Sequence, residues 1–270
     1  LSQIPTRSLE TADFVSNSEV EIDQYVRFVA GKEITTGLYN TLIGGLAGDA
    51  LTDADSNVAV GQSALTSDTL GSFSVAIGQN ALASQNFTTA TNAYNVAVGK
   101  GAGETITTGV NNALFGGLAG DSLTDADYNV AIGKGALSSD TLGSRSVAVG
   151  GDALFTQNLT TATNTYNTAV GTAAGYLLTT GTLNTFIGGL AGDAATVSAR
   201  NVAVGYAALS ADRQGSRSVA IGAFALVNQD FGNSTNVFNT AVGYDAGVSV
   251  TSGDKNTLIG GTAGDAITTG

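Results

Sequence analysis

A five-residue motif that begins with Asn or Ser and ends with Gly recurs thirteen times in this chain of 270 residues. Successive starts are separated by 17, 17, 21 and 17 residues, and this series repeats with a period of 72. Short repeats within a strict longer period are typical of a solenoid, in which each coil contacts only its neighbours. A compact enzyme fold is therefore not expected. The motifs begin at Asn40, Asn57, Ser74, Asn95, Asn112, Asn129, Ser146, Asn167, Asn184, Asn201, Ser218, Asn239 and Asn256.

The period divides the chain into two parts. Residues 40–270 form the repeat region, with super-repeats 40–111, 112–183 and 184–255 and a partial one at 256–270. Residues 1–39 lack the motif. They are expected to be a linker, a cap over the first coil or the end of a preceding domain, because an open solenoid edge must be covered. Alternation of residue types predicts a surface strand over 20–23 and a lead-in to the first coil over 25–29.

Each motif predicts a short strand. In the second copy, Val58 and Val60 point to one side of the strand and Ala59 to the other. Both sides are apolar, so we expect both to be covered. One coil is too thin to do this alone, so one side should fill the coil and the other should meet partner chains. The small third residues, such as Ala59 and Ala76, are assigned to that contact between chains.

The predicted fold is therefore an all-β parallel β-roll or β-solenoid of about thirteen coils. We expect it to assemble as an intertwined or side-by-side homotrimeric fibre. A second short strand is expected in each coil after the motif, as at Ala64–Leu65 and Ala102–Gly103.

The Gly that closes the motif is present in all thirteen coils. We interpret it as a turn that needs a positive φ, or as a place where a Cβ would strike a neighbouring backbone. Duplication without a present constraint is the alternative. These structural glycines are Gly44, Gly61, Gly78, Gly99, Gly116, Gly133, Gly150, Gly171, Gly188, Gly205, Gly222, Gly243 and Gly260.

Composition excludes several chemistries. The chain has no Cys and no His, so it offers no zinc site, thiol nucleophile, disulfide or Ser-His-Asp relay. The net charge of −12 argues against nucleic acid and anionic membranes as partners. No window reaches the roughly 18 apolar residues of a membrane span. We expect no catalytic residues, no metal, no cofactor, no nucleic-acid binding and no membrane insertion.

Acidic loops offer one alternative to a metal-free chain. The segment Asp49–Asp55 and its copy Asp121–Asp127 cluster carboxylates that could hold Ca²⁺. The third copy keeps only Asp193. A solvated acidic loop is the favoured interpretation.

The 21-residue coils offer a second candidate site, because their four extra residues must leave the regular roll. Loops on a rigid scaffold often bind ligands. Packing against the coil edge is the favoured role for the recurring apolar residues of these loops. The possible surface-contact residues are Phe87, Tyr94, Leu159, Tyr166, Phe231 and Phe238.

Hydrolysis of a polysaccharide would need two carboxylates about 5–10 Å apart in a cleft. Asp68, Asp140 and Asp212 instead recur at one site per super-repeat, which indicates a structural turn. The chain is not expected to be an enzyme.

The motif resembles two known families. The segments 57–61 and 74–78, Asn-Val-Ala-Val-Gly and Ser-Val-Ala-Ile-Gly, each followed by Ala-Leu, resemble the head repeats of trimeric autotransporter adhesins, which form left-handed parallel β-rolls. Segments 107–112 and 239–247 resemble bacteriophage tail-fibre repeats more closely. The resemblance covers about residues 34–270, and the 17/17/21/17 spacing departs from the shorter, uniform adhesin coil.

The resemblance implies a structural and adhesive fibre shaft of a phage tail, located on the virion, that presents a receptor-binding tip. Its implied partners are further copies of itself, other virion tail or fibre proteins, and a host surface glycan or protein. The head of a bacterial trimeric adhesin on the cell surface is the alternative. A polysaccharide-degrading tailspike is a distant third.

Overall fold

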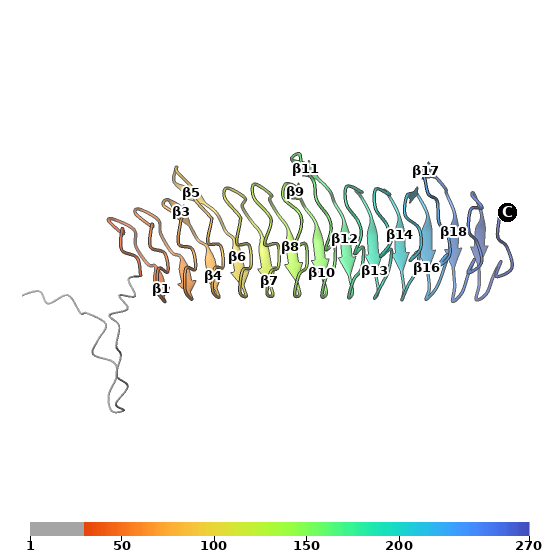
Figure 1. Cartoon of the computed structure of the whole chain (residues 1–270), viewed down its shortest axis with the longest axis horizontal. Coiled ribbons are helices and arrows are strands. Elements are labelled where there is room, and N and C mark those ends of the chain that lie inside the picture. Colours follow the sequence, from red (N-terminus) through yellow and green to blue (C-terminus); the bar gives the residue numbers. More distant parts are fainter. Residues whose placement is uncertain (1–29, 270) are drawn as a thin grey trace, which may run out of the picture.

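The computed structural model describes residues 30–269, which form one elongated parallel β-solenoid (Figure 1). Each coil contributes one three-residue strand to a single sheet of thirteen parallel strands in chain order. This confirms the predicted fold class and the number of coils. The strands are β1 Thr41–Ile43, β2 Val58–Val60, β4 Val75–Ile77, β6 Val96–Val98, β7 Ala113–Phe115, β8 Val130–Ile132, β10 Val147–Val149, β12 Thr168–Val170, β13 Thr185–Ile187, β14 Val202–Val204, β16 Val219–Ile221, β18 Thr240–Val242 and β19 Thr257–Ile259.

Equivalent motif positions pair with one another along the whole sheet. Ala59 pairs with Ala76 across a 17-residue interval. Ala76 pairs with Ala97 across a 21-residue interval, so the four extra residues do not shift the register. The repeat of 17, 17, 21 and 17 residues is therefore a repeat of loop length around a constant strand.

The two sides of the sheet are assigned differently from the sequence prediction. The third residue of each motif points into the solenoid, where Ala59, Ala76 and Phe186 are fully buried. The second and fourth residues point outward, and Ile77 is 38% exposed. Assignment of the small third residues to a contact between chains was therefore wrong. Small size serves the interior, because the coil must also hold the side chains that follow the motif.

Core packing follows from an exchange of large and small residues. Leu65 and Leu82 fill the interior of coils whose third motif residue is Ala. Where that residue is large, Gly takes the equivalent place: a Cβ on Gly192 would lie 2.6 Å from the Phe186 ring. Close packing of this kind leaves no room for a large residue at both places.

The second strand expected after each motif is absent from residues 30–269, and a turn takes its place. Ser63 and Leu65 both have a left-handed backbone, with φ of 55° and 52°. Residues in that region reverse the chain and cannot continue a strand. The prediction at Ala64–Leu65 and Ala102–Gly103 was wrong because Leu at a left-handed position carries no turn signal in the sequence.

The remaining strands belong to the 21-residue coils. Each long loop forms a two-residue strand that pairs with the preceding coil, and these loops rise above their neighbours in Figure 1. The pairs are β3 Gly71–Ser72 with β5 Thr91–Asn92, β9 Gly143–Ser144 with β11 Thr163–Asn164, and β15 Gly215–Ser216 with β17 Thr235–Asn236.

The described structure begins shortly before the first motif. The backbone N–H of Gly31 donates to the carbonyl of Ala47, and that of Glu33 to Asp49, so residues 31–33 already stack on the first coil. The strand expected over 20–23 and the lead-in over 25–29 lie outside the described residues.

Candidate interaction surfaces

The thirteen closing glycines lie in a row along the solenoid. Their φ angles range from 125° to 142°. A Cβ on Gly133 would lie 2.5 Å from the carbonyl oxygen of Gly150 in the next coil. Every glycine of the row except Gly260, in the last coil, therefore combines a positive φ with close backbone approach, and each condition on its own disfavours a side chain.

The first motif residue builds a buried asparagine ladder. Asn57 donates its backbone N–H to Oδ1 of Asn40 at 2.9 Å, and its Nδ2 to the carbonyl of Gly71 at 2.9 Å. Its own Oδ1 accepts the N–H of Ser74 at 2.8 Å. The amide of each such Asn links its own strand, the return of its own coil and the next strand. These groups are occupied in holding coils together.

Ser replaces Asn once per super-repeat, and a Gln eleven residues later fills the gap. Gln85 donates to Oγ of Ser74 at 2.9 Å and to Oδ2 of Asp68 at 2.6 Å, while its Oε1 accepts from Asn95. All four side chains are buried. The signal was present in the sequence as the pairs Ser74/Gln85, Ser146/Gln157 and Ser218/Gln229.

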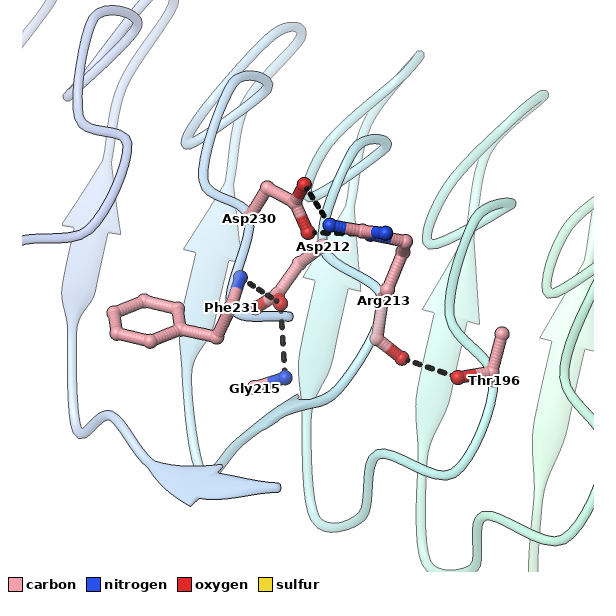
Figure 2. Close-up of polar contacts among 6 residues, drawn as sticks. All are labelled: Thr196, Asp212, Arg213, Gly215, Asp230 and Phe231. Carbon is pink, nitrogen blue, oxygen red and sulfur yellow. Dashed lines mark hydrogen bonds and ion pairs between the residues drawn. The ribbon is translucent and has the colours of Figure 1, made fainter. Parts of the chain in front are cut away.

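The recurring aspartates are part of this network, as the structural-turn interpretation predicts. Figure 2 shows Asp212, whose Oδ1 accepts the backbone N–H of Gly215 at 2.9 Å and of Phe231 at 3.1 Å. Gln229 donates to its other oxygen. Burial raises the pKa of Asp212, while the hydrogen bonds from Gln229, Gly215 and Phe231 act in the opposite direction. Asp212 therefore closes a turn inside the coil.

Above this turn, the third super-repeat carries an ion pair on the surface. Arg213 donates through Nε and Nη2 to the two carboxylate oxygens of Asp230, at 2.9 and 2.8 Å (Figure 2). The first super-repeat has Thr69 and Asn86 at these places, which share a hydrogen bond of 3.2 Å. Both versions connect the same two coils. Exposed pairs of this kind contribute little to stability, because water and salt screen the two charges.

The contact residues proposed for the long loops fall into two groups. Phe87 and Leu159 are 6% exposed, as the packing interpretation predicts, and Phe231 is half-buried. The other three are about half exposed: Tyr94, Tyr166 and Phe238. Only this second group presents side chains to a ligand or partner.

In each acidic loop, two of the three carboxylates bond to the preceding coil. Oδ1 of Asp53 accepts from the Thr36 hydroxyl, and Oδ1 of Asp55 accepts the backbone N–H of Leu38 at 2.6 Å. Asp125 and Asp127 repeat the arrangement one super-repeat later. Across residues 30–269, no group of three or more acidic, His or Cys side chains is placed to hold a metal ion.

The outer side of the main sheet is an apolar strip. It consists of the second and fourth motif residues, most of them Val, Ile or Thr. The bulkier fourth residues are the more exposed: Phe115 is 40% and Ile132 41% exposed. Contiguous apolar surface along a whole element is typical of a protein–protein contact.

One edge of this strip, the leading edge, is formed by the residue that precedes each motif. All thirteen have a left-handed backbone, with φ between 51° and 68°. Six are aromatic and four are cationic, although Gly, Asn and Asp adopt this conformation most readily. The leading edge consists of Tyr39, Ser56, Phe73, Tyr94, Asn111, Tyr128, Arg145, Tyr166, Leu183, Arg200, Arg217, Phe238 and Lys255.

The opposite edge, the trailing edge, is formed by the two residues that follow each closing Gly. The second of each pair is also left-handed, with φ between 51° and 67°, yet small and polar residues predominate there. The large side chains of the leading edge are therefore not a requirement of the backbone. The trailing edge consists of Gly45–Leu46, Gln62–Ser63, Gln79–Asn80, Lys100–Gly101, Gly117–Leu118, Lys134–Gly135, Gly151–Asp152, Thr172–Ala173, Gly189–Leu190, Tyr206–Ala207, Ala223–Phe224, Tyr244–Asp245 and Gly261–Thr262.

Comparison with known proteins returned no match among family models, curated proteins or solved structures. Within residues 30–269 the structure contains no helix that could cross a membrane. The structure defines the chain as a parallel β-solenoid with an apolar outer sheet face.

Proposed function

We propose that the chain is the shaft of a homotrimeric fibre in a phage tail, where it holds a receptor-binding tip away from the particle. The observation that carries this proposal is the thirteen-stranded sheet whose outer face presents an apolar fourth motif residue in every coil. The face is straight, has constant register and runs the full length of the rod. Another copy of the same chain matches it in length and period.

The apolar face favours association through the sheet. Parallel sheets are generally covered on both sides, and here one side is covered by the coil interior. The outward residues Val58, Val60 and Ile77 are partly exposed in a single chain. Burial of apolar surface contributes about 25 cal/mol per Å². Association around a common axis would bury this strip in every copy, and the number three follows the resemblance to trimeric families.

The repetition of the features that stiffen the rod favours a fibre shaft over a receptor-binding head. The asparagine ladder and the glycine row repeat in every super-repeat, whereas the loops change. The loop Asp49–Ser56 becomes Asp193–Arg200, and only the first acid is kept. A receptor site built on these loops would need one polar constellation in all copies.

An adsorption experiment tests this proposal. The labelled chain is mixed with a panel of bacterial cells, and bound protein is compared with that of a triple variant, Phe87→Ser, Leu159→Ser and Phe231→Ser. We expect weak adsorption of both proteins and a lower melting temperature for the variant, because Phe87 and Leu159 are buried. Strong adsorption that the three changes abolish at unchanged stability would overturn the shaft assignment.

The type of domain encoded after the repeats distinguishes a phage tail fibre from a bacterial adhesin. A receptor-binding tip or a chaperone domain after the repeats would support a tail fibre. A membrane-anchoring barrel in that place would contradict it and favour a bacterial adhesin.

A further inference from the structure

The two edges of the apolar strip are placed to meet each other in a closed trimer. When identical chains surround an axis parallel to the rod, the trailing edge of one copy faces the leading edge of the next at the same height. This follows from rotation alone, since every copy presents the same face. The inference below rests on the proposed homotrimer and specifies its contact.

Cationic side chains are concentrated on these two edges and never face each other across them. Of the eight Lys and Arg residues within 30–269, six lie on the edges. Lys100 and Lys134 are on the trailing edge, and the other four are on the leading edge. No coil has a cation on both edges, so no pair of like positive charges would arise between copies. The remaining four are Arg145, Arg200, Arg217 and Lys255.

The residue opposite each cation is an aromatic ring in four coils. On the trailing edge, Lys100 and Lys134 belong to the coils that carry Tyr94 and Tyr128 on the leading edge. In two later coils the arrangement is reversed. Cations attract the faces of aromatic rings, so the pairing suits a contact in either direction.

The reversed pairs are Arg200 with Tyr206 and Arg217 with Phe224. Tyr206 is 53% exposed, and its ring lies 5.4 Å from that of Phe224. In these two coils the cation is on the leading edge and the aromatic ring is on the trailing edge, which is the opposite of the arrangement at Lys100 and Lys134. A surface that only faced solvent, or that bound an anionic polymer along one edge, would not require this exchange.

Other coils continue the match. Arg145 on the leading edge is opposite Asp152, an opposite charge. Leu183 is opposite Leu190, and Phe238 is opposite Tyr244. Lys255 is the exception, because Gly261 and Thr262 stand opposite it.

These pairs do not form within one chain: none of the charged pairs is joined by an ion pair or cation–π contact within residues 30–269. The two edges lie at opposite ends of the strand, six or seven residues apart. The partners that Arg145 has within its own chain are on the coils above and below: the Tyr128 ring at 4.7 Å and Asn164 at 3.2 Å. The side chains of Lys134 and Asp152 make no hydrogen bond or ion pair within residues 30–269.

We propose that the leading edge of each copy packs, coil against equal coil, on the trailing edge of the next copy, and that the alternating cations and rings fix their relative height. A slip of one coil would place Tyr128 opposite Gly117–Leu118 or Gly151–Asp152, and would leave Lys134 without its ring. The apolar strip has almost the same composition in every coil and cannot set the height by itself. The pairs on the two edges differ from coil to coil, so they can set the relative height of the copies.

Cysteine cross-linking tests this directly, because the natural chain contains no Cys. The double variant Arg145→Cys/Asp152→Cys is oxidised and run on a denaturing gel without reductant. The control, Arg145→Cys/Asp245→Cys, uses the same two edges five coils apart, a height difference of about 24 Å. A disulfide needs Cα atoms within about 7 Å. A second test pair, Tyr128→Cys/Lys134→Cys, lies one coil away.

We expect covalent trimers from both test pairs, at least tenfold above the control, and none from single-cysteine variants. Trimers in solution, seen by light scattering, without cross-links in either test pair would overturn the edge pairing while leaving the trimer proposal intact. Cross-linking of the control pair to an equal degree would also overturn it. A monomer in solution would contradict both proposals.

Discussion

Gly133 lies against the backbone of Gly150 so closely that a Cβ on Gly133 would be 2.5 Å from the Gly150 carbonyl oxygen. The N–H of Gly133 also donates to the carbonyl of Phe115 in the preceding coil at 2.7 Å. The residue therefore has neighbouring backbone on both sides and a φ of 132°. No side chain fits without moving a coil.

Replacement of this residue should weaken the whole rod. We expect Gly133→Ala to lower the stability by about 2–4 kcal/mol per chain, from a strained φ and a clash with rigid backbone. Thermal unfolding followed by circular dichroism measures the loss. Gly151→Ala is the matched control, because a Cβ there meets nothing within 4 Å. Equal melting temperatures for the two variants would show that the glycine row is a relic of duplication.

The buried Gln of the long coils should be as sensitive. Gln85→Leu keeps the size but leaves Asp68 Oδ2, Ser74 Oγ and Asn95 Nδ2 without the bonds they make to Gln85. We expect a loss of about 3 kcal/mol or more, since each unpaired buried group costs about 1–3 kcal/mol. Chemical denaturation measures it. The exposed Gln62→Leu should change stability by less than about 0.5 kcal/mol. Similar small effects at both positions would contradict the network.

The exchange of large and small residues in the core predicts that the stability effects of two residues of one coil are coupled. Phe186 and Ala195 take the places that Leu114 and Leu123 hold one super-repeat earlier. Phe186→Leu should open a cavity and Ala195→Leu should overfill the coil, each costing about 1–3 kcal/mol. The double variant restores the Leu–Leu combination and should recover most of the loss. Additive effects in a double-mutant cycle would show that the two positions do not share a space.

Burial of Asp212 predicts a pH dependence with a defined sign. Its pKa is raised in the folded chain, so the folded state holds the proton more tightly than the unfolded state does. This contribution to stability is present in acid and is lost as the pH rises from about 4 through the raised pKa.

Asp212→Asn does not titrate and should lack this component. We expect the melting temperature of the natural chain, relative to the variant, to be highest near pH 3 and to fall toward neutral pH. The variant should also be less stable at neutral pH, because its amide Nδ2 would face Nε2 of Gln229. A difference between the two proteins that rises with pH would contradict the assignment.

Much of the fold could be predicted from the sequence, because the motif recurs at fixed intervals. Regular spacing of Asn57, Ser74 and Asn95 predicts stacked coils, and Val58 with Val60 predicts the strand between them. What the residues could not show was the inner side of that strand. Val58 and Ala59 are both apolar, and only the packing of the coil interior, where Ala59 and Leu65 are both fully buried, decides which one is inside.

Two features of the structure could not be predicted from the sequence, because no residue type indicates them. Left-handed backbone at Leu65 and Tyr94 is set by the coil, against the preference of those residues. The buried network around Gln85 was readable only as a correlation, since each Ser in the motif is followed by a Gln eleven residues later. The role of a polar residue inside a coil can be recognised only when the positions of its hydrogen-bond partners are known.

The mass of the intact particle in solution tests the central claim most directly. Light scattering coupled to size exclusion, at neutral pH and without denaturant, should give about 80 kDa, three times the chain mass of 26.8 kDa. The apolar face of the sheet would then be buried in the particle. A mass near 27 kDa at micromolar concentration would leave that face exposed to water and contradict the fibre account.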